Sequence, residues 1–402
     1  MRRFVEADEL MPYWPKAWRE DDFWLQPSML GFLCEHPQGM RTEALILENE
    51  LDRRRILLTS QAFTFRAAGQ VSDTAKGETS RYDLRRRLLA PLSFEILCIG
   101  QFLTSGDYCQ DGLQQLSPTE ASELLPAVAD TLLECDRTYT AVLLKDLYPT
   151  AHDVVQILRA AGYYTLPVDP IMKLELDPHW NNIEDYLETV TSKYRVRYRR
   201  ARGKLAGLRR QRLSVQDVAT NQDRIYQLYA NVSSGADFNA ATLTPDYFPW
   251  LAQQGAKVLS HPWLSNSQLA SVYAEDGLAL SGPVQFHGYF TEGDELVGFT
   301  SSVANGSVLH AHYLGLEDDY KYSHHLYHNM LFDLLEEGIE GGFATLDYGR
   351  TALEIKSSIG AKPIDYACLL KTRRNWVNKL VPIFTPAVYR AHEWTPRNPF
   401  KR

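Results

Sequence analysis

The chain has 402 residues, of which 45% are hydrophobic and 23% are charged, and its formal net charge is −8. This composition excludes a disordered or collagen-like chain, and the length suffices for two domains with separate hydrophobic cores. Five scattered cysteines without a C-x-x-C pair favour reduced thiols in the cytoplasm over disulfides or a zinc ribbon. The N-terminus has charges but no apolar run behind them, and no uncharged stretch approaches the ~20 residues of a spanning helix. We therefore expect a cytoplasmic protein without a signal peptide or transmembrane segment.

The first half of the chain alternates between predicted strands and helices after an aromatic and proline-rich start. Ser117-Pro118-Thr119-Glu120 is typical of a helix start, because proline is tolerated in the first turn, where its missing N–H does no harm. The predicted elements are strands at 44–47, 56–65, 93–103 and 139–144, helices at 117–135 and 150–161, and an extended run at 163–176.

A long amphipathic helix is predicted at the start of the second half, over residues 182–208. Its apolar residues recur at spacings of three and four along one face. Ten basic residues and no acidic one lie between Lys193 and Arg212, whereas the rest of the chain has 32 basic and 50 acidic residues. This asymmetry indicates either an anionic ligand or partner at the helix, or a solvated helix face.

An antiparallel meander is predicted further along. The predicted elements are helices at 224–232 and 245–253 and strands at 284–290, 296–303 and from 308 onward. Asn305-Gly306 is a hairpin signal between the last two strands. Side chains alternate along a strand, so one face of the third strand should carry every second residue. These residues are Val308, His310, His312 and Leu314.

A helix and a short buried strand are predicted after the meander. Ser323 is the expected N-cap of the helix, and the apolar residues behind it recur at helical spacing. Gly341-Gly342 should end the helix, because glycine adopts the left-handed conformation at little cost. The buried strand is expected over residues 343–348.

A second, short helix is predicted to carry Lys356. Thr351 and Glu354 have the spacing of a capping box, which would satisfy amide donors at the start of this helix, and Gly360 would end it. Small or apolar residues lie three and four positions from the lysine on either side. We interpret the gap around Lys356 as the candidate site.

The second half, roughly residues 181–371, resembles a GNAT-superfamily acyltransferase domain. The branch is that of the cellulose-biosynthesis-associated acetyltransferase-like proteins and the Fem-type peptidoglycan aminoacyl transferases. The matching features are the hairpin at Asn305-Gly306, the strand into Tyr313-Leu314-Gly315 and the segment L-D-Y-G-R-T-A-L-E-I-K-S-S-I-G-A, with Lys356 four residues before Gly360. The segment S-K-Y-R-V-R-Y-R-R-A-R also resembles the helix that opens the second domain of Fem-type proteins.

The resemblance implies an α/β (α+β) fold with two tandem GNAT-like domains, each a mixed, mostly antiparallel sheet flanked by helices. The expected divisions are a degenerate GNAT-like domain at 1–180, an acyltransferase domain at 181–371 and an aromatic and proline-rich tail at 372–402. The first domain is assigned by analogy of pattern. We expect the main pocket near the junction, within reach of Arg195, His312 and Lys356.

The reaction that the resemblance implies is transfer of an acyl group to an amine. Lys356 could stabilise a developing oxyanion or a donor phosphate, or it could extend its head to water. His310 and His312 are candidate bases for the proton of the attacking amine, and hydrogen-bonded structural histidines are the alternative.

Five further residues are candidates for substrate binding: Arg350, Arg195, Arg199, Arg202 and Tyr313. Arg350 follows the buried strand and could clamp a phosphate or carboxylate, or pair with Asp347 or Glu354. The three arginines of the basic helix run beside its apolar stripe, from where their heads could reach a cleft and bind phosphates. Tyr313 belongs to the strand that carries the resemblance.

The acyl donor is left open between acyl-CoA, an acyl carrier protein and an aminoacyl-tRNA, each as a cosubstrate, with no covalently bound cofactor. Acetyl-CoA enzymes of the superfamily usually have a glycine-rich loop after the fourth strand, whose amides bind the pyrophosphate. Here that position has one glycine and the carboxylates Glu317-Asp318-Asp319, which repel a pyrophosphate.

Two alternatives to an N-acyltransferase with an acyl-CoA or acyl-carrier donor remain. One is a Fem-type aminoacyl-tRNA-dependent transferase acting on a peptide or cell-envelope precursor, and the other is a GNAT-fold binding protein without activity. The expected acceptor is a small-molecule or peptide amine, and DNA is not an expected partner.

The remaining motifs bear on a metal site and on contact with a membrane surface. His324 and His328 have the spacing of one helix face, but no H-E-x-x-H pattern is present, so no metal is expected. The prolines of the tail prevent a long helix. We expect the tail to pack back onto the body, with peripheral membrane contact as the alternative if the acceptor is a lipid.

Overall fold

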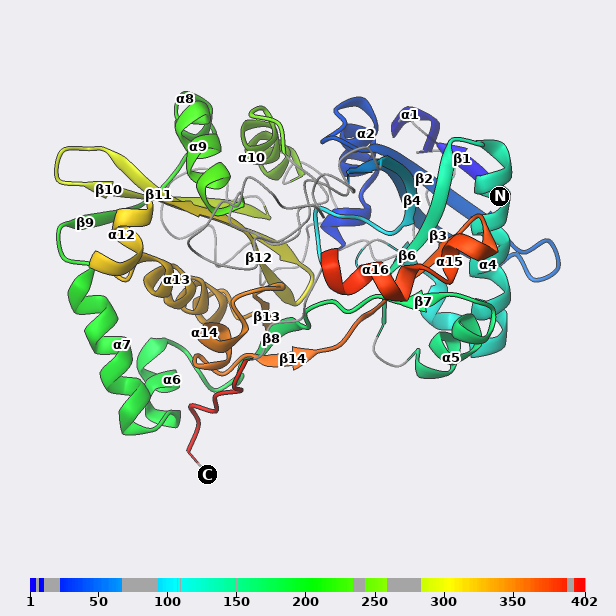
Figure 1. Ribbon diagram of the computed structural model, residues 1–402. Helices are drawn as coiled ribbons and strands as arrows, with labels where there is room; N and C mark the ends of the chain where they lie inside the picture. Colours follow the sequence, from blue (N-terminus) through cyan, green and yellow to red (C-terminus); the bar gives the residue numbers. More distant parts are fainter. Residues whose placement is uncertain are drawn as a thin grey trace, which may run out of the picture.

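The computed structural model describes residues 1–4, 7–10, 22–66, 93–106, 108, 110–148, 151–233, 243–258, 283–388 and 394–401. These residues form two mixed sheets, each flanked by helices, which lie side by side (Figure 1). This confirms the expected α/β fold class of two domains, each a mixed, mostly antiparallel sheet flanked by helices. No helix among the described residues is long and apolar enough to cross a lipid bilayer.

The eight-stranded sheet, here called the N-terminal sheet, has the order β1-β2-β3-β4-β6-β15-β7, with β5 paired to β3. Its strands are β1 (Arg2–Phe4), β2 (Arg41–Glu48), β3 (Arg55–Arg66), β4 (Ser93–Ile99), β5 (Gln110–Asp111), β6 (Tyr139–Leu147), β7 (Tyr164–Thr165) and β15 (Ala367–Thr372). The associated helices are α1 (Ala7–Leu10), α2 (Pro27–Glu35), α4 (Pro118–Cys135) and α5 (His152–Ala160), with short 3-10 turns at Phe23–Leu25 and Leu113–Gln115. The predicted start of α4 is confirmed, and Ser117 and Glu120 bond each other's backbone N–H in a capping box.

The seven-stranded sheet, here called the C-terminal sheet, has the order β14-β8-β13-β12-β11-β10-β9. Its strands are β8 (Ile171–Glu175), β9 (Leu208–Arg212), β10 (Val284–Thr291), β11 (Leu296–Asn305), β12 (Val308–Leu316), β13 (Thr345–Asp347) and β14 (Lys362–Ile364). Helices α8 (Val215–Thr220), α9 (Gln222–Ser233) and α10 (Tyr247–Val258) lie on one side in Figure 1. The other helices are α6 (Ile183–Thr189), α7 (Ser192–Lys204), α12 (Asp318–Ser323), α13 (Leu326–Glu340), α14 (Leu353–Ser357), α15 (Asn375–Asn378) and α16 (Val381–Val388). The predicted meander β10-β11-β12 and its hairpin at Asn305 are confirmed.

Each sheet contains one parallel pair of strands joined through a helix. β4 and β6 are connected through α4, and β12 and β13 through α13. All other strand pairs of the described residues are antiparallel. The two halves therefore repeat one arrangement of strand, helix and parallel strand.

The two halves of the chain exchange one strand each. β8 lies before residue 180 but pairs with β13 and β14 in the C-terminal sheet. β15 lies in the second half but pairs with β6 and β7 in the N-terminal sheet. The expected division at residue 180 thus differs from sheet membership, because pairing across the two halves is not encoded in the local pattern of either strand.

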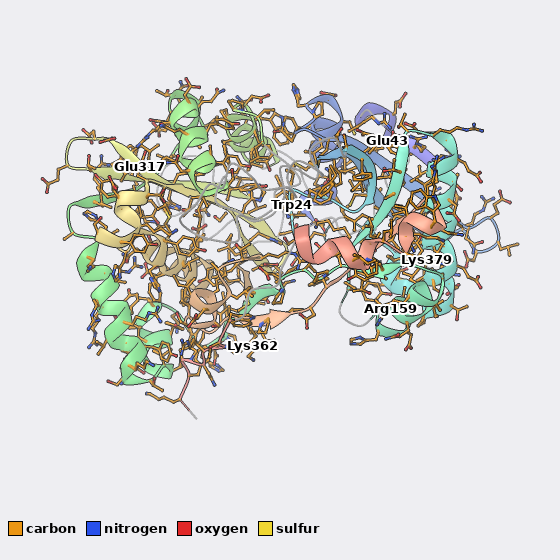
Figure 2. The ribbon with its side chains drawn as sticks, in the orientation of Figure 1. Trp24, Glu43, Arg159, Glu317, Lys362 and Lys379 are labelled. Carbon is orange, nitrogen blue, oxygen red and sulfur yellow. The ribbon has the colours of Figure 1, made fainter. Side chains whose placement is uncertain are left out.

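A shared hydrophobic core joins the two sheets. One cluster of buried side chains includes Trp24, Phe63 and Cys368 around the N-terminal sheet together with Phe248 and Phe299 around the C-terminal sheet. Trp24 is fully buried and lies between the two bodies (Figure 2). The domains are therefore packed against each other rather than joined by a free linker.

Two predicted helix boundaries were wrong. The helix expected over 182–208 is broken, because Val190 is extended and forms a β-bridge with Phe400 from the C-terminal segment. The last three basic residues of the run that ends at Arg212, namely Arg209, Arg210 and Arg212, belong to the edge strand β9. Ser323 ends α12 instead of capping α13, whose N-cap is His325 in the left-handed conformation.

Candidate functional site

The C-terminal sheet diverges beside the parallel pair β12 and β13. The two strands pair over three residues each, from Val308–His310 to Thr345–Asp347. β12 then continues to Leu316, whereas the chain leaves β13 through the left-handed Gly349. The backbone carbonyls of this turn and the far half of β12 therefore lie at the place where the strands separate.

A β-bulge in β12 determines which side chains face the N-terminal sheet. Ser302 pairs with Ala311 and Thr300 pairs with Leu314, so two residues of β12 oppose the single residue Ser301. The Ser301 hydroxyl satisfies this bulge, donating to the carbonyl O of Tyr313 and accepting from its N–H, each at 3.0 Å.

The bulge corrects the expectation that four residues share one face of β12. Beyond it the alternation is reversed. Leu314 packs with Leu326 and Met330 of α13, whereas His310 contacts Trp24 on the opposite face. The face therefore carries His310 and the bulge residues but not Leu314.

Lys356 lies at the divergence and is almost completely buried, with 4% of its surface exposed. Its Nζ donates to the carbonyl O of Arg350 at 2.5 Å and to that of Gly349 at 3.4 Å. None of the described carboxylates lies within ion-pair distance of this nitrogen. Burial lowers the pKa of Lys356 to about 7, against the opposing charges of Asp347 and Asp169. The amine is thus poised between its charged and neutral forms near neutral pH.

Helix α14, which carries Lys356, is anchored differently from the prediction. Its N-cap is Ala352, which makes no side-chain cap bond, so the expected capping box is absent. Thr351 and Ala352 are both left-handed, and Glu354 instead accepts from Nε of Arg397 at 2.9 Å. The segment 394–401 thus packs back onto the body, as expected for the tail.

A buried carboxylate beside Lys356 collects groups from both sheets. Asp347 is 2% exposed and accepts from the N–H of Gly349 at 2.8 Å. Nζ of Lys173, on the exchanged strand β8, lies 3.5 Å from Asp347 and donates to the hydroxyls of Tyr108 at 3.0 Å and Tyr366 at 3.2 Å. Tyr108 belongs to the N-terminal half, and its hydroxyl is 3.5 Å from Asp347. Residues from both halves of the chain therefore build the site.

The two candidate histidines contact aromatic side chains from the N-terminal half and from α10. The ring of His310 lies 4.3 Å from that of Tyr108, and the ring of His312 lies 4.8 Å from that of Trp24. Nε2 of His312 is 2.7 Å from the hydroxyl of Tyr247. Burial, with a contribution from His310, lowers the pKa of His312 to about 3. His312 is thus neutral at pH 7 but accepts a proton poorly, which weakens its case as a general base.

Arg350 is engaged inside the protein. Its guanidinium forms an ion pair with Asp146 of β6 and donates to the carbonyl O of Asp169. This pairing differs from the expected alternatives, which were a substrate anion, Asp347 or Glu354. Tyr313, the other candidate near β12, is half-buried and packs edge-on against Tyr229 and Phe248.

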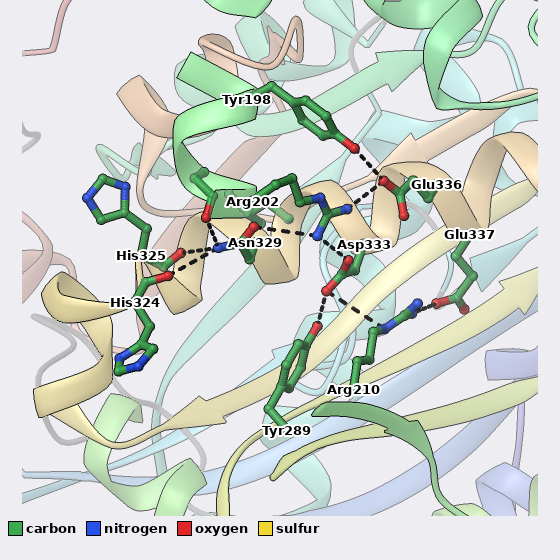
Figure 3. Close-up of polar contacts among 12 residues, drawn as sticks. Tyr198, Arg202, Arg210, Tyr289, His324, His325, Asn329, Asp333, Glu336 and Glu337 are labelled. Carbon is green, nitrogen blue, oxygen red and sulfur yellow. Dashed lines mark hydrogen bonds and ion pairs between the residues drawn. The ribbon is translucent and has the colours of Figure 1, made fainter. Parts of the chain in front are cut away.

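The three candidate arginines of α7 are not gathered at Lys356. Arg202 is partly buried against α13, where it forms ion pairs of 2.5 Å each with Asp333 and Glu336 (Figure 3). Arg195 donates to the carbonyl O of Val190 at 2.7 Å, at the break between α6 and α7. Arg199 is exposed. These contacts therefore do not bring Arg195, His312 and Lys356 together at one pocket.

The histidines near α13 do not share one helix face. His324 is the C-cap of α12, and His328 lies in the first turn of α13. The carbonyl oxygens of His324 and His325 accept from the side-chain amide of Asn329 (Figure 3). These histidines therefore lie at the junction between α12 and α13.

Sequence reasoning missed several residues of the site, chiefly Lys173, Tyr108 and Asp146. A lysine between Met172 and Leu174 in an apolar strand was a usable signal, because an unpaired charge is costly inside a sheet. Tyr108 and Asp146 gave no local signal, since their role depends on contacts across the two halves.

Comparison with known proteins shows likeness only at the level of the chain's fold. No protein-family model matches the chain, and no curated protein matches it. Among solved structures, FemX has a TM-score of 0.47 at 11% identity, covering 96% of this chain and 100% of that one. L-PGS from Bacillus licheniformis has a TM-score of 0.45 at 12% identity, covering 90% and 92%. A GCN5-related N-acetyltransferase from Kribbella flavida has a TM-score of 0.35 at 10% identity, covering 69% and 80%.

Proposed function

We propose that the protein is a cytoplasmic N-acyltransferase that moves an acyl group from an acyl-CoA or acyl-carrier donor to a small-molecule or peptide amine. The observation that carries this proposal is the buried amine of Lys356 at the divergence of β12 and β13. A lysine held by two carbonyl oxygens, without a carboxylate partner among the described residues, can offer its charge to a developing oxyanion.

The chemistry assigned to Lys356 follows from the charge changes of acyl transfer. The acceptor nitrogen forms a bond to the acyl carbon, the carbonyl oxygen becomes an oxyanion, and the bond to the donor's leaving group then breaks. The proton lost by the amine passes to the leaving group. An ammonium near the oxyanion stabilises the tetrahedral intermediate more than the ground state, which raises turnover.

The region before α13 bears on the choice of donor. Glu317 forms an ion pair of 2.7 Å with Arg224, and Asp318 and Asp319 are exposed in the first turn of α12. Three carboxylates there disfavour a pyrophosphate in the position usual for acetyl-CoA enzymes. A carrier-bound acyl group is therefore the preferred donor within this proposal.

An aminoacyl-tRNA-dependent transferase is the second candidate, and the surface of α7 favours it. Five basic residues of this helix are exposed and form no ion pair among the described residues: Lys193, Arg197, Arg199, Arg200 and Lys204. Such a row of cations suits a phosphate backbone. A non-catalytic binding protein is less well supported, because the expected sign, an exposed and ion-paired Lys356, is absent from the described structure.

A thermal-shift panel of acyl-CoAs, acylated carrier protein and aminoacyl-tRNA tests the proposal, because a ligand at 100 times its Kd stabilises by about 2.7 kcal/mol. The expected result is stabilisation by the carrier protein or an acyl-CoA, followed by acyl transfer to amines. A matched variant replaces Arg197, Arg200 and Lys204 by glutamine. Stabilisation by tRNA alone, lost in this variant and at high salt, would establish the second candidate instead.

A further inference from the structure

Asp146 is a buried carboxylate at the end of β6 in the N-terminal sheet, with 2% of its surface exposed. Four donors surround its two oxygens. Oδ2 accepts from Nζ of Lys145 at 2.5 Å and from the N–H of Gly106 at 2.9 Å, and Oδ1 accepts from the guanidinium of Arg350 and from Sγ of Cys368 at 3.3 Å. Its backbone is left-handed, with φ of 56°. A non-glycine residue held there with a saturated carboxylate indicates an over-determined position.

Arg350 connects this carboxylate to Lys356. The guanidinium is held at one nitrogen by Asp146 and at the other by the carbonyl O of Asp169. The backbone carbonyl O of Arg350 accepts from Nζ of Lys356 at 2.5 Å. Asp146 of the N-terminal sheet thus holds the side chain of Arg350, and the backbone of Arg350 binds Lys356.

The exchanged strands support this link from both directions. β15 brings Cys368 from the second half of the chain to Asp146, and β8 brings Lys173 from the first half to Asp347. Both contacts depend on the two sheets keeping their relative position.

We propose that Asp146 and Arg350 form an interdomain lock that positions Lys356, so that the N-terminal domain is a working part of the site. This inference rests on the proposed function of Lys356. Asp146 and Arg350 are positioning residues in this account, and Arg350 is not a substrate clamp, because its guanidinium is already occupied by two partners.

The charges around Lys356 determine in which direction its pKa should change when the lock is broken. The charges that act on its amine are those of Asp347 on β13 and Asp169 before β8, and Lys173 is paired to Asp347. The carbonyl O of Arg350, in the turn after β13, accepts from the amine. The charges of Lys145 and Arg350 overcome the effect of burial and lower the pKa of Asp146 to about 2, so the lock is ionised at pH 7. Asp146→Asn removes one negative charge and leaves uncompensated the guanidinium of Arg350, the residue whose carbonyl O binds Lys356. The ammonium form of Lys356 should then be less favourable.

The test is the pH titration of Lys356 in the full chain, followed by NMR of 13Cε-labelled lysine and assigned with Lys356→Met. Asp146→Asn should raise the acid dissociation constant of Lys356 about tenfold. The double variant Asp146→Asn/Arg350→Gln removes both charges and should return the constant to within about threefold of the wild-type value. The matched control is Asp333→Asn, because Asp333 is an equally buried partner of an arginine, Arg202, elsewhere in the molecule (Figure 3). It should leave the titration of Lys356 unchanged.

Two outcomes overturn the lock: an unchanged titration of Lys356 in Asp146→Asn, or the same change in Asp333→Asn. If Asp146→Asn does not fold, Arg350→Gln decides. It leaves the negative charge of Asp146 uncompensated and should lower the acid dissociation constant of Lys356 about tenfold, and an unchanged constant overturns the lock. Where acyl transfer is measurable, Asp146→Asn should lower kcat about tenfold and leave KM of the donor within about threefold. The NMR result stands apart from activity, so absence of acyl transfer would refute the proposed function without deciding the lock.

Discussion

The burial of Lys356 predicts that this one residue makes the protein more stable as the pH rises. Burial lowers its pKa in the folded protein to about 7, compared with an ordinary value of 10.5. Between these values the unfolded chain binds more protons than the folded one, so the free energy of unfolding increases with pH. The full effect is about 5 kcal/mol, since each pH unit of separation corresponds to ~1.36 kcal/mol. It is absent below pH 7, where the cost of the buried charge is constant.

Lys356→Met removes the titrating group and keeps the apolar stem. The variant no longer has the unfavourable burial of an ammonium. It also loses two hydrogen bonds to carbonyl oxygens, and each carbonyl left without a donor costs about 1–3 kcal/mol. Its stability relative to the wild type should therefore fall by about 3 kcal/mol between pH 6 and pH 9.5, whatever its value at pH 6.

Urea denaturation of both proteins at pH 6 and pH 9.5 measures this difference. The control is Lys362→Met, because the Lys362 side chain is 75% exposed and its loss should change stability by less than about 0.5 kcal/mol at either pH. A stability difference between Lys356→Met and the wild type that is independent of pH would refute the reasoning, since it would mean that the amine is solvated or fully ion-paired in the folded protein.

Three further variants test the supporting structure by urea denaturation. Gly360→Ala should cost about 1–3 kcal/mol, because this glycine has φ of 110° and a Cβ there would meet the ring of Phe400 at 2.5 Å; unchanged stability would contradict the position of the C-terminal segment. Arg202→Gln should cost about 3 kcal/mol, because it removes the arginine that forms ion pairs with Asp333 and Glu336 of α13, whereas Arg199→Gln on the exposed face of the same helix should stay within about 0.5 kcal/mol. Ser301→Ala should cost about 1–3 kcal/mol, because it leaves two backbone groups of the bulge unpaired; a neutral effect would argue against the bulge.

Much of the fold was readable from local patterns. Period-two alternation and the Asn305-Gly306 hairpin predicted the meander, and the segment Ser117-Pro118-Thr119-Glu120 predicted the start of α4. These features depend on residues close together in the chain. The strand exchange was not readable, because β8 and β15 have apolar patterns that suit either sheet.

The errors near the site have a common cause, which is that long-range contacts override local preference. The pairing of Val190 with Phe400 breaks the predicted helix, although its apolar stripe runs through that position. Glu354 pairs with Arg397 instead of capping α14. The apolar neighbours of Lys356 indicated its surroundings, whereas the pair of Asp146 and Arg350 joins residues 204 positions apart in the chain.

The central claim is that Lys356 acts on the transition state, and the kinetics of Lys356→Met test it most directly. Steady-state acyl transfer should be measured with the donor identified by the thermal-shift panel. A preorganised charge facing an oxyanion contributes ~3 kcal/mol, so turnover should fall about 100-fold while the donor's affinity changes by less than about tenfold. A raised KM with intact turnover would contradict the claim, because Lys356 would then be a phosphate-binding residue and the stabilisation of the oxyanion would have to come from the backbone or side chains of β12.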